Sequence, residues 1–158
     1  MAPLIFLVLT ALFLVAESTP HGNVTGVIQL KKYYVITDYR TFVSAMLMCK
    51  ILGMKMATVK NIDEQLLLKE AIDTYDLTES GYWIGAGTEI GNEDDFHWVE
   101  TGVKLTYTNW GSLQPNFDFH DKYAGNCVRV GNYDKVNEPY KWQSVDCNIE
   151  TYYICEIE

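Results

Sequence analysis

The sequence is poor in basic residues, in cysteine and histidine, and in long apolar runs. Its 12 lysines and arginines are outnumbered by 21 acidic residues, which gives a formal net charge of −9 at pH 7. The only local basic cluster is the pair Lys31-Lys32. Because a phosphate-binding protein needs a clustered basic face, the sequence disfavours nucleic acid as a partner. The acidic balance is compatible with extracellular solubility, with cationic partners or with cation binding, and it does not choose among them.

One long apolar run is present, and it lies at the start of the chain. Pro3 to Ala16 is almost unbroken and ends in the small-x-small pattern Ala16-Glu17-Ser18. About 14 apolar residues fall short of the roughly 20 that a spanning helix needs, so we interpret residues 1–18 as a cleaved signal peptide rather than as a membrane anchor. No second such run follows. We therefore expect a secreted, extracellular protein without a membrane span.

Secretion changes how the four cysteines are interpreted; they are Cys49, Cys127, Cys147 and Cys155. An oxidising compartment makes disulfides the default. No C-x₂-C or C-x₄-C pair is present and no histidine lies at ligand spacing, which argues against zinc. Two bridges remain, in one of three pairings. Secretion also makes Asn23, in the only N-x-S/T sequon, a candidate glycosylation site on an N-terminal arm of residues 19–31.

Common catalytic motifs are missing as well. There is no G-x-S-x-G and no H-E-x-x-H, and the three histidines have no nucleophile partner in the sequence. Those histidines are His21, His97 and His120. A glycosidase with paired carboxylates would have to draw on Asp94, Asp95, Asp118 and Asp121. We expect a protein that is not an enzyme.

The pattern that is present predicts an α+β domain. Apolar residues at three-to-four spacing from Phe42 to Leu52 predict a helix, which Thr37-Asp38 would cap and whose buried face holds Cys49. Asn61-Ile62-Asp63-Glu64 is a capping box, so a second helix is expected up to about Tyr75. Short strands are expected at 32–36, 56–59, 81–85, 96–99, 128–130, 141–142 and 152–156. Helices early and strands late are typical of an α+β domain rather than an alternating parallel sheet.

Most of the specific polar chemistry lies between Tyr107 and Cys147. Gln114-Pro115-Asn116 places two amides around one proline. A cis Gln114–Pro115 bond, which costs only about 0.5–1 kcal/mol relative to trans, would hold both carbonyl oxygens on one side of the backbone. Such oxygens can coordinate a hard cation or hydrogen-bond a diol. The acidic residues between Glu89 and Asp95 could supply half of a calcium site, although a solvated acidic loop explains them as well.

Taken in order, these features resemble a C-type lectin domain. The resemblance is carried by the cysteine-bearing helix, the second helix, Trp83-Ile84-Gly85, Thr106 to Trp110, Gln114-Pro115-Asn116, Cys127, Trp142 to Cys147 and Tyr153-Ile154-Cys155-Glu156. It covers roughly residues 33–158, and we place the domain at 32–158. The resemblance implies the pairs Cys49–Cys155 and Cys127–Cys147. It also implies a cis Gln114–Pro115 bond, short antiparallel strands and a long irregular loop region that recognises sugar.

The resemblance further implies a calcium ion between protein and sugar, but this sequence departs from the family pattern. Gln114 and Asn116 match two ligand positions, whereas Gly125 stands where a glutamate is expected and Gln143-Ser144 replaces an Asn-Asp pair. No carboxylate remains at the five positions, and ligand charge largely sets calcium affinity. We therefore expect a degenerate site in which Ca²⁺ is doubtful. The acidic residues that could rescue it are Asp118, Asp121 and Asp146.

Two functions follow from the resemblance. The first is binding of a carbohydrate or glycoprotein by a non-catalytic lectin that uses Gln114, Asn116 and Gln143. The second is calcium-independent binding of a protein ligand on the same face, with aromatic side chains of the loop region as anchors. Those side chains belong to Tyr107, Phe117, Phe119, Tyr123 and Tyr133. The Gln-Pro-Asn triplet is intermediate between the family's galactose and mannose patterns, so it does not name the sugar.

Overall fold

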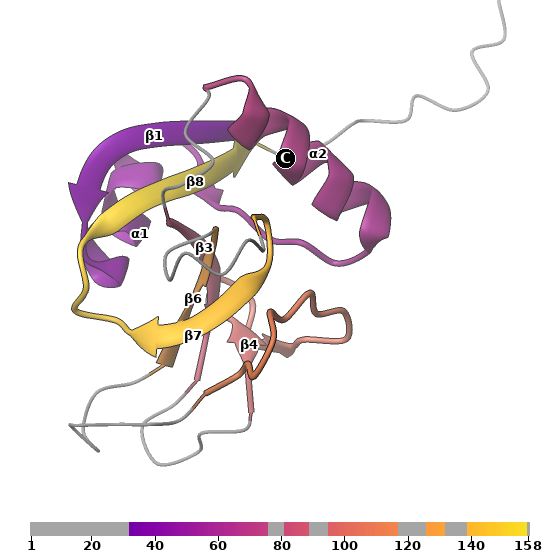
Figure 1. Cartoon of the computed structure of the whole chain (residues 1–158). Coiled ribbons are helices and arrows are strands. Elements are labelled where there is room, and N and C mark those ends of the chain that lie inside the picture. The colour runs from indigo at the N-terminus through magenta and orange to yellow at the C-terminus, as the bar shows by residue number, and fades with distance from the viewer. Residues whose placement is uncertain (1–31, 76–80, 89–94, 117–125, 132–138, 158) are drawn as a thin grey trace, which may run out of the picture.

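The structure is a computed structural model that describes residues 32–75, 81–88, 95–116, 126–131 and 139–157 (Figure 1). Its helices are α1, Phe42–Ile51, and α2, Ile62–Asp73. Its strands are β1 Lys32–Arg40, β2 Lys55–Met56, β3 Tyr82–Gly87, β4 His97–Trp98, β5 Val103–Lys104, β6 Asn126–Val130, β7 Trp142–Asp146 and β8 Thr151–Ile157. The expected signal peptide and the arm with Asn23 lie outside these ranges. Within them, no helix is long and apolar enough to cross a membrane.

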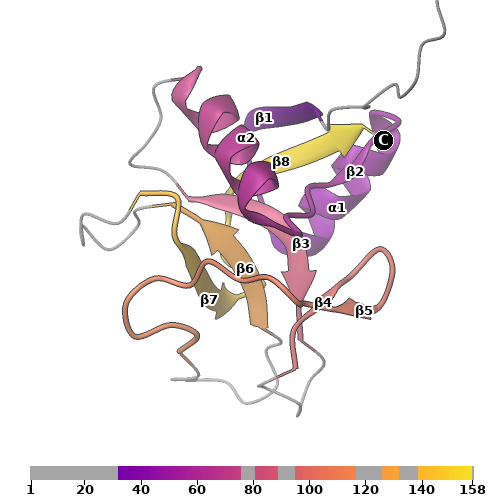
Figure 2. The same ribbon diagram turned by 90° about the vertical axis from the view of Figure 1, so that its right-hand side faces the viewer.

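The strands form one sheet in the order β1-β8-β3-β4-β5, with β2 paired to β8 and with β6 between β3 and β7. Every pair is antiparallel except β3 with β8, which is parallel. In both ribbon views β1 and β8 lie with the helices, while β6 and β7 lie on the other side of β3 (Figures 1 and 2). The expected α+β class is confirmed. β6 and β7 carry Cys127 and the segment from Trp142 to Asp146, two of the segments that the sequence singled out.

Helix α1 confirms the first predicted helix, but it begins later than the predicted cap. β1 continues to Arg40, which pairs with Thr151 of β8 beyond a register shift. Thr41 is the N-cap residue instead, with extended backbone angles of φ −65° and ψ 160°. Asp38 accepts a hydrogen bond of 2.8 Å from Arg40 Nε. Pairing with β8 therefore overrides the local capping signal at Thr37-Asp38.

Helix α2 confirms the predicted capping box in part. Asn61 Oδ1 accepts a hydrogen bond of 2.9 Å from the Glu64 backbone N–H, as expected. The Glu64 carboxylate accepts from the Lys60 N–H at 2.6 Å, one residue before the position that a capping box uses. The helix ends at Asp73, shortly before the predicted end. The buried residues of α2 are Gln65, Leu68 and Ile72.

Among the described residues, the core consists of two apolar clusters that share β3. Tyr82 and Ile84 belong to one cluster, whereas Trp83 belongs to the other, because successive residues of a strand point to opposite faces. The nested disulfides are confirmed as Cys49–Cys155, which joins α1 to β8, and Cys127–Cys147, which begins on β6. In the chain-entropy model, loops of these sizes contribute about 4.7 and 3 kcal/mol.

A buried carboxylate lies where β2 meets β8. Glu156 is 1% exposed, and its two oxygens accept hydrogen bonds from the Thr58 N–H and the Thr58 hydroxyl, both at 3.0 Å. Lys55 Nζ lies 3.5 Å from Glu156 Oε1. In the sequence, Glu156 belongs to a predicted strand and to the motif Tyr153-Ile154-Cys155-Glu156, but no local pattern assigns it a role. The structure makes it the polar link between β8 and the segment after β2.

Tyr33 adds a titratable group to this cluster. Its hydroxyl donates to the Thr58 carbonyl at 2.6 Å, and burial, followed by the carboxylates of Glu156 and Glu64, raises the pKa of Tyr33 far above its usual value. The folded state thus keeps a proton that the unfolded state releases above about pH 10, so stability falls as pH rises past that point.

We expect Tyr33→Phe to remove up to about 1.4 kcal/mol per pH unit of this alkaline loss of stability. Urea unfolding of both proteins between about pH 9 and 11 measures it, and parallel curves would contradict the assignment.

Candidate functional site

The segment 109–116 is held along the outer edge of β7. Trp110 forms a parallel bridge with Trp142. The Trp142 N–H donates to Asn109 O at 2.8 Å, and the Gly111 N–H donates to Trp142 O at 2.9 Å. Because these are main-chain hydrogen bonds, the position of this loop is set by the backbone of β7.

The side chain of Trp142 fastens the same loop to the core. It is fully buried, and its Nε1–H donates to Gln65 Oε1 on α2 at 2.9 Å. The rings of Trp98, Tyr107 and Trp110 surround it at centroid distances of 6.1, 5.9 and 5.8 Å, each nearly perpendicular to it. Such edge-to-face pairs are favourable beyond the area that they bury. Tyr107, one of the five candidate anchors for a protein ligand, therefore packs on the core, and the other four lie outside the described residues.

The side chain of Asn109 also holds the start of the loop in place. Its Nδ2 donates to Tyr140 O at 3.0 Å, and its Oδ1 accepts from Lys141 Nζ at 3.0 Å. Gln65 Nε2 donates to the same Tyr140 oxygen at 3.2 Å. Tyr140 has a positive φ of 71°, which is uncommon for a residue other than glycine. The amide of Asn109 is thus engaged in positioning, although the sequence alone would allow it to face a ligand.

The predicted cis Gln114–Pro115 bond is confirmed. Gln114 Oε1 accepts from the Ser144 N–H at 2.9 Å and lies 3.2 Å from the Ser144 hydroxyl and from the Asn116 N–H. The Ser144 hydroxyl also donates to Asn116 O and accepts from the Asn116 N–H, both at 2.8 Å. We call Gln114, Asn116 and Ser144 the clasp. It closes the proline loop onto β7, and all three of its residues lie at positions that the family resemblance assigns to calcium.

The clasp presents the wrong polarity to a cation. Gln114 Oε1 is directed at N–H and O–H groups, whereas a calcium ligand directs its oxygen at the ion. Ser144 stands where the family resemblance implies an aspartate and is 6% exposed. Within the described ranges, no group of three or more His, Cys, Asp or Glu side chains could hold a metal ion. These described residues do not fit a calcium ion in this arrangement. Asp118 and Asp121 lie outside the described residues.

The structure does not bring Gln143 to the clasp. Gln143 and Ser144 are consecutive on β7, so their side chains point to opposite faces. Gln143 Oε1 accepts from Arg129 Nε on β6 at 2.9 Å. Asn116, in contrast, is exposed beside Gln114. Of the three predicted sugar-binding residues, Gln114 and Asn116 belong to the clasp, whereas the side chain of Gln143 lies on the opposite face of β7.

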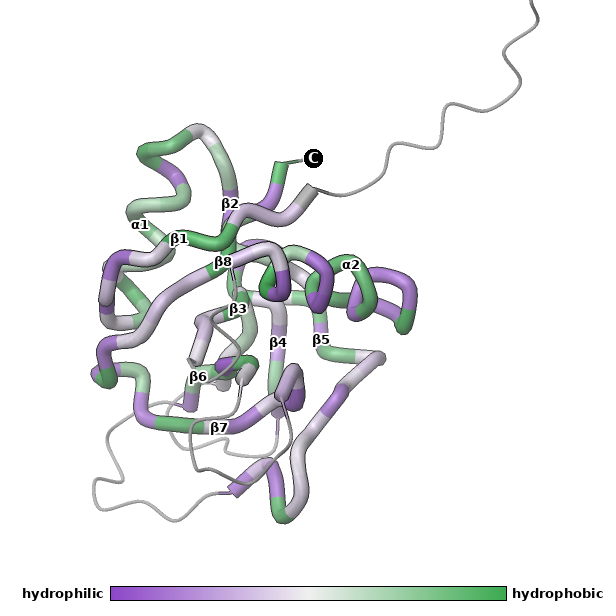
Figure 3. Tube along the Cα trace, turned by 45° about the horizontal axis from the view of Figure 1, so that its top comes forward, coloured by the Kyte–Doolittle hydropathy of each residue, from purple (hydrophilic) through white to green (hydrophobic). Residues whose placement is uncertain are grey.

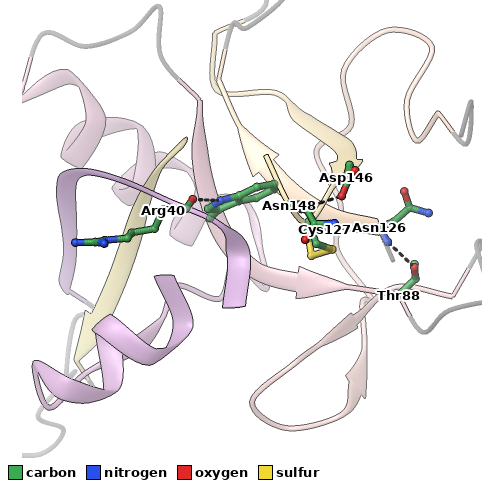
Figure 4. The surroundings of a disulfide bond; sticks show 8 residues. Arg40, Thr88, Asn126, Cys127, Asp146 and Asn148 are labelled. Carbon is green, nitrogen blue, oxygen red and sulfur yellow. Dashed lines mark hydrogen bonds between the residues drawn. A yellow bond between two sulfur atoms is a disulfide. The ribbon is translucent and has the colours of Figure 1, made fainter. Parts of the chain in front are cut away.

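Asp146, the described acidic residue that could rescue a calcium site, lies at the end of β7 near the Cys127–Cys147 disulfide (Figure 4). Its Oδ1 accepts from the Asn148 N–H at 2.8 Å. This hydrogen bond belongs to the turn that follows β7. In the described arrangement the Asp146 carboxylate therefore stabilises that turn.

A residue that the sequence analysis missed lies in the same loop. Leu113 is 91% exposed and has φ 59°, in the left-handed region that costs a leucine of order 1–3 kcal/mol. The turn is closed by the Gln114 N–H, which donates to Gly111 O at 3.2 Å. The sequence carries no signal for this, because leucine is not a residue that favours φ > 0. The loop holds an apolar side chain in water next to the clasp.

The described residues of the acidic loop and the histidine set show no catalytic arrangement. Asp95 Oδ1 lies 2.8 Å from Lys104 Nζ, and His97 Nδ1 lies 2.9 Å from the Asp95 carbonyl oxygen. These contacts join the segment before β4 to β5 and to β4. Asp94, His21 and His120 lie outside the described residues.

The family assignment follows from comparison with known proteins. The sequence profile of the family described as "Lectin C-type domain" matches residues 38–157. The chain belongs to this family. It is 27% identical to C-type lectin mosGCTL-7 of Aedes aegypti over 80% of this chain and 83% of that protein. It is 26% identical to C-type lectin mosGCTL-7 of Culex quinquefasciatus over 68% of this chain, but spans only 63% of that relative's length.

Solved structures show the same fold. Human lithostathine superposes with a TM-score of 0.69 at 24% identity, covering 94% of this chain and 96% of that one. A chain described as the SPL-1–GlcNAc complex superposes with a TM-score of 0.65 at 20% identity, covering 80% and 87%. At these identities the likeness establishes the C-type lectin fold, with its two helices and two disulfides.

Proposed function

We propose that this chain is a secreted, non-catalytic lectin that binds carbohydrate without calcium through the loop face around the clasp. The observation that carries the proposal is the engagement of Gln114 Oε1 by Ser144 and Asn116. Those hydrogen bonds hold the proline loop in place by neutral contacts, where a calcium-dependent site would use the ion. Secretion is supported by the leading apolar run and by the two disulfides.

The proposal implies weak binding at a single site. A neutral hydrogen bond contributes about 0.5–1.5 kcal/mol net, so three or four of them give about −4 kcal/mol, which corresponds to a millimolar Kd. The exposed side chain of Asn116 is the described group best placed to contact a sugar. Since the loop is already fixed to β7, little ordering is required on binding.

Carbohydrate binding is expected to survive removal of calcium. A glycan array probed with the mature protein, with and without EDTA, should show the same weak signals, and Asn116→Ala should reduce them severalfold because it removes an exposed polar group. Gln143→Ala serves as the comparison, since its side chain points to the opposite face of β7. Signals abolished by EDTA would refute the calcium-independent mechanism.

Thermal unfolding provides the companion measurement. A site with a Kd of about 1 mM would stabilise the protein by about 1.4 kcal/mol in about 10 mM Ca²⁺, which raises Tm by roughly 3–8 °C. We expect a change below about 1 °C, equal to that in the same concentration of Mg²⁺. A shift specific to Ca²⁺ would show that residues outside the clasp restore the ion.

Leu113 favours a second candidate function, the binding of a protein ligand. An apolar side chain that is 91% exposed suits an apolar pocket on another protein better than the hydroxyl-rich surface of a sugar. Leu113→Asn should weaken binding of a protein ligand and leave glycan binding unchanged. Asparagine tolerates φ > 0, so the variant keeps the conformation of the loop. If no glycan binds to the wild type, this candidate takes precedence.

A further inference from the structure

Helix α1 exposes a row of apolar side chains on the side opposite its buried residues. The trace of the helix is largely apolar in colour (Figure 3). Its buried residues are Phe42, Ala45 and Cys49. On the opposite side Val43, Leu47 and Ile51 are 56%, 53% and 74% exposed. These three residues, which we call the α1 stripe, have i, i+4, i+8 spacing and so form one row along the helix. The outer face of a surface helix ordinarily carries polar side chains, so this exposed apolar row indicates an interaction surface.

The segment of sequence that contains the α1 stripe has no acidic residues. No aspartate or glutamate occurs from Tyr39 to Ile62, although the chain carries a net charge of −9. Three of the basic side chains in this segment are neutralised by carboxylates from outside it. The pairs are Arg40 with Asp38 at 2.8 Å, Lys50 with Glu100 at 3.5 Å and Lys55 with Glu156 at 3.5 Å. The stripe therefore lies in a nearly neutral part of an acidic protein.

We propose that the α1 stripe is a surface on which two copies of this chain associate about a two-fold axis. Antiparallel packing on an axis through Leu47 places Leu47 against Leu47 of the second copy and Val43 against its Ile51. Two-fold contacts use the same patch on both subunits, and this row is complementary to itself.

Charge favours a second copy over the other occupants of an apolar helix face. Two chains of net charge −9 repel each other, and the segment that carries the α1 stripe contains no acidic residue of its own. An anionic membrane surface would attract unpaired lysines and arginines beside the apolar row, whereas Arg40, Lys50 and Lys55 are already paired. A neutral, self-complementary row fits an identical row.

The association is expected to be weak. The ten residues of α1 span about 15 Å, so the contact falls below the roughly 1,200 Å² that stable complexes bury. A Kd on the order of 10–100 µM is expected for such an interface. This inference does not depend on the proposed function. If both hold, the dimer presents two loop faces, and multivalent ligands bind it more tightly than a single weak site allows.

Sedimentation velocity of the mature protein from about 5 µM to 1 mM tests the proposal. The wild type should pass from monomer towards dimer over this range. Leu47→Glu and Leu47→Arg should each raise the dissociation constant at least tenfold, because the two-fold axis places like charges together. An equimolar mixture of the two variants should restore the dimer, since glutamate then faces arginine across the axis.

Leu66→Glu on α2 is the matched control, because Leu66 is 57% exposed, close to Leu47 at 53%, and lies outside the stripe. It should leave the dimer unchanged. A wild type that stays monomeric at about 1 mM would overturn the proposal, and so would a mixture of the two Leu47 variants that stays monomeric. Restoration in the mixture also shows that both variants are folded.

Discussion

Glu156→Ala is expected to lower the free energy of unfolding by about 3–5 kcal/mol. The carboxylate is 1% exposed and satisfies the N–H and the hydroxyl of Thr58, while Lys55 Nζ lies 3.5 Å away. Truncation leaves the buried Thr58 donors without their acceptor and the Lys55 ammonium without its counter-charge, which is the costly way to break a buried pair. Urea unfolding with both disulfides intact measures the loss.

The double variant Lys55→Met, Glu156→Leu removes both charges but keeps most of the side-chain volume. It therefore separates the cost of an unpaired charge from the cost of a cavity. Removing both partners avoids an uncompensated charge, so the double variant should be more stable than Glu156→Ala even though the Thr58 N–H loses the carboxylate that accepts its hydrogen bond. A double-mutant cycle should therefore show strong coupling between the two positions. A loss below about 1 kcal/mol in Glu156→Ala would mean that water reaches the Thr58 donors.

The alternation of side chains along the predicted strand indicates that Glu156 is buried. Ile154 and Glu156 are two residues apart on β8, so they share a face, and Ile154 belongs to the core. Alternation therefore directs Glu156 inward once the strand is recognised. Its partner Thr58 lies 98 positions away. No local pattern identifies a hydrogen bond across that separation, so the role of Glu156 needed the structure.

Element boundaries differ from the predictions where tertiary pairing decides them. The pattern at Lys141-Trp142 indicated a very short strand, because Gln143, Ser144 and Asp146 have weak strand propensity. In the structure β7 extends to Asp146, since β6 pairs with it along its whole length and the loop 109–116 hydrogen-bonds its other edge. Thr37-Asp38 likewise remained in β1 because β8 continues past them. In both places a distant strand outweighed local preference.

The candidate site was predicted in composition but not in arrangement. The motif spacing identified Gln114 and Asn116 as two matched positions of a metal site and Ser144 as one of its altered positions. It could not show that Ser144 N–H and Oγ turn towards Gln114 Oε1, because that contact spans 30 positions and depends on the edge of β7. The exposure of Leu113 had no signal at all, as leucine neither favours φ > 0 nor marks a turn.

Trp142→Ala is expected to cost about 3–5 kcal/mol and to loosen the loop 109–116. The indole is fully buried and is surrounded by Trp98, Tyr107 and Trp110, so truncation leaves a large cavity. The main-chain hydrogen bonds of residue 142 to the loop persist only while the strand keeps its place. Urea unfolding measures the first effect, and faster hydrogen exchange of the Gly111 N–H measures the second.

Trp142→Phe separates the ring from its N–H group. Phenylalanine keeps an aromatic side chain against Trp98 and Trp110 but leaves Gln65 Oε1 on α2 without its donor, a loss of about 1–3 kcal/mol. A second substitution, Gln65→Leu, removes the unpaired oxygen and should recover part of that loss. If Trp142→Phe is as damaging as Trp142→Ala, the indole N–H rather than the packing holds the loop face to α2. If the free energy of unfolding of Trp142→Phe equals that of the wild type, Gln65 Oε1 has another donor. The hydrogen bond from Trp142 to α2 is then not what holds the loop in place.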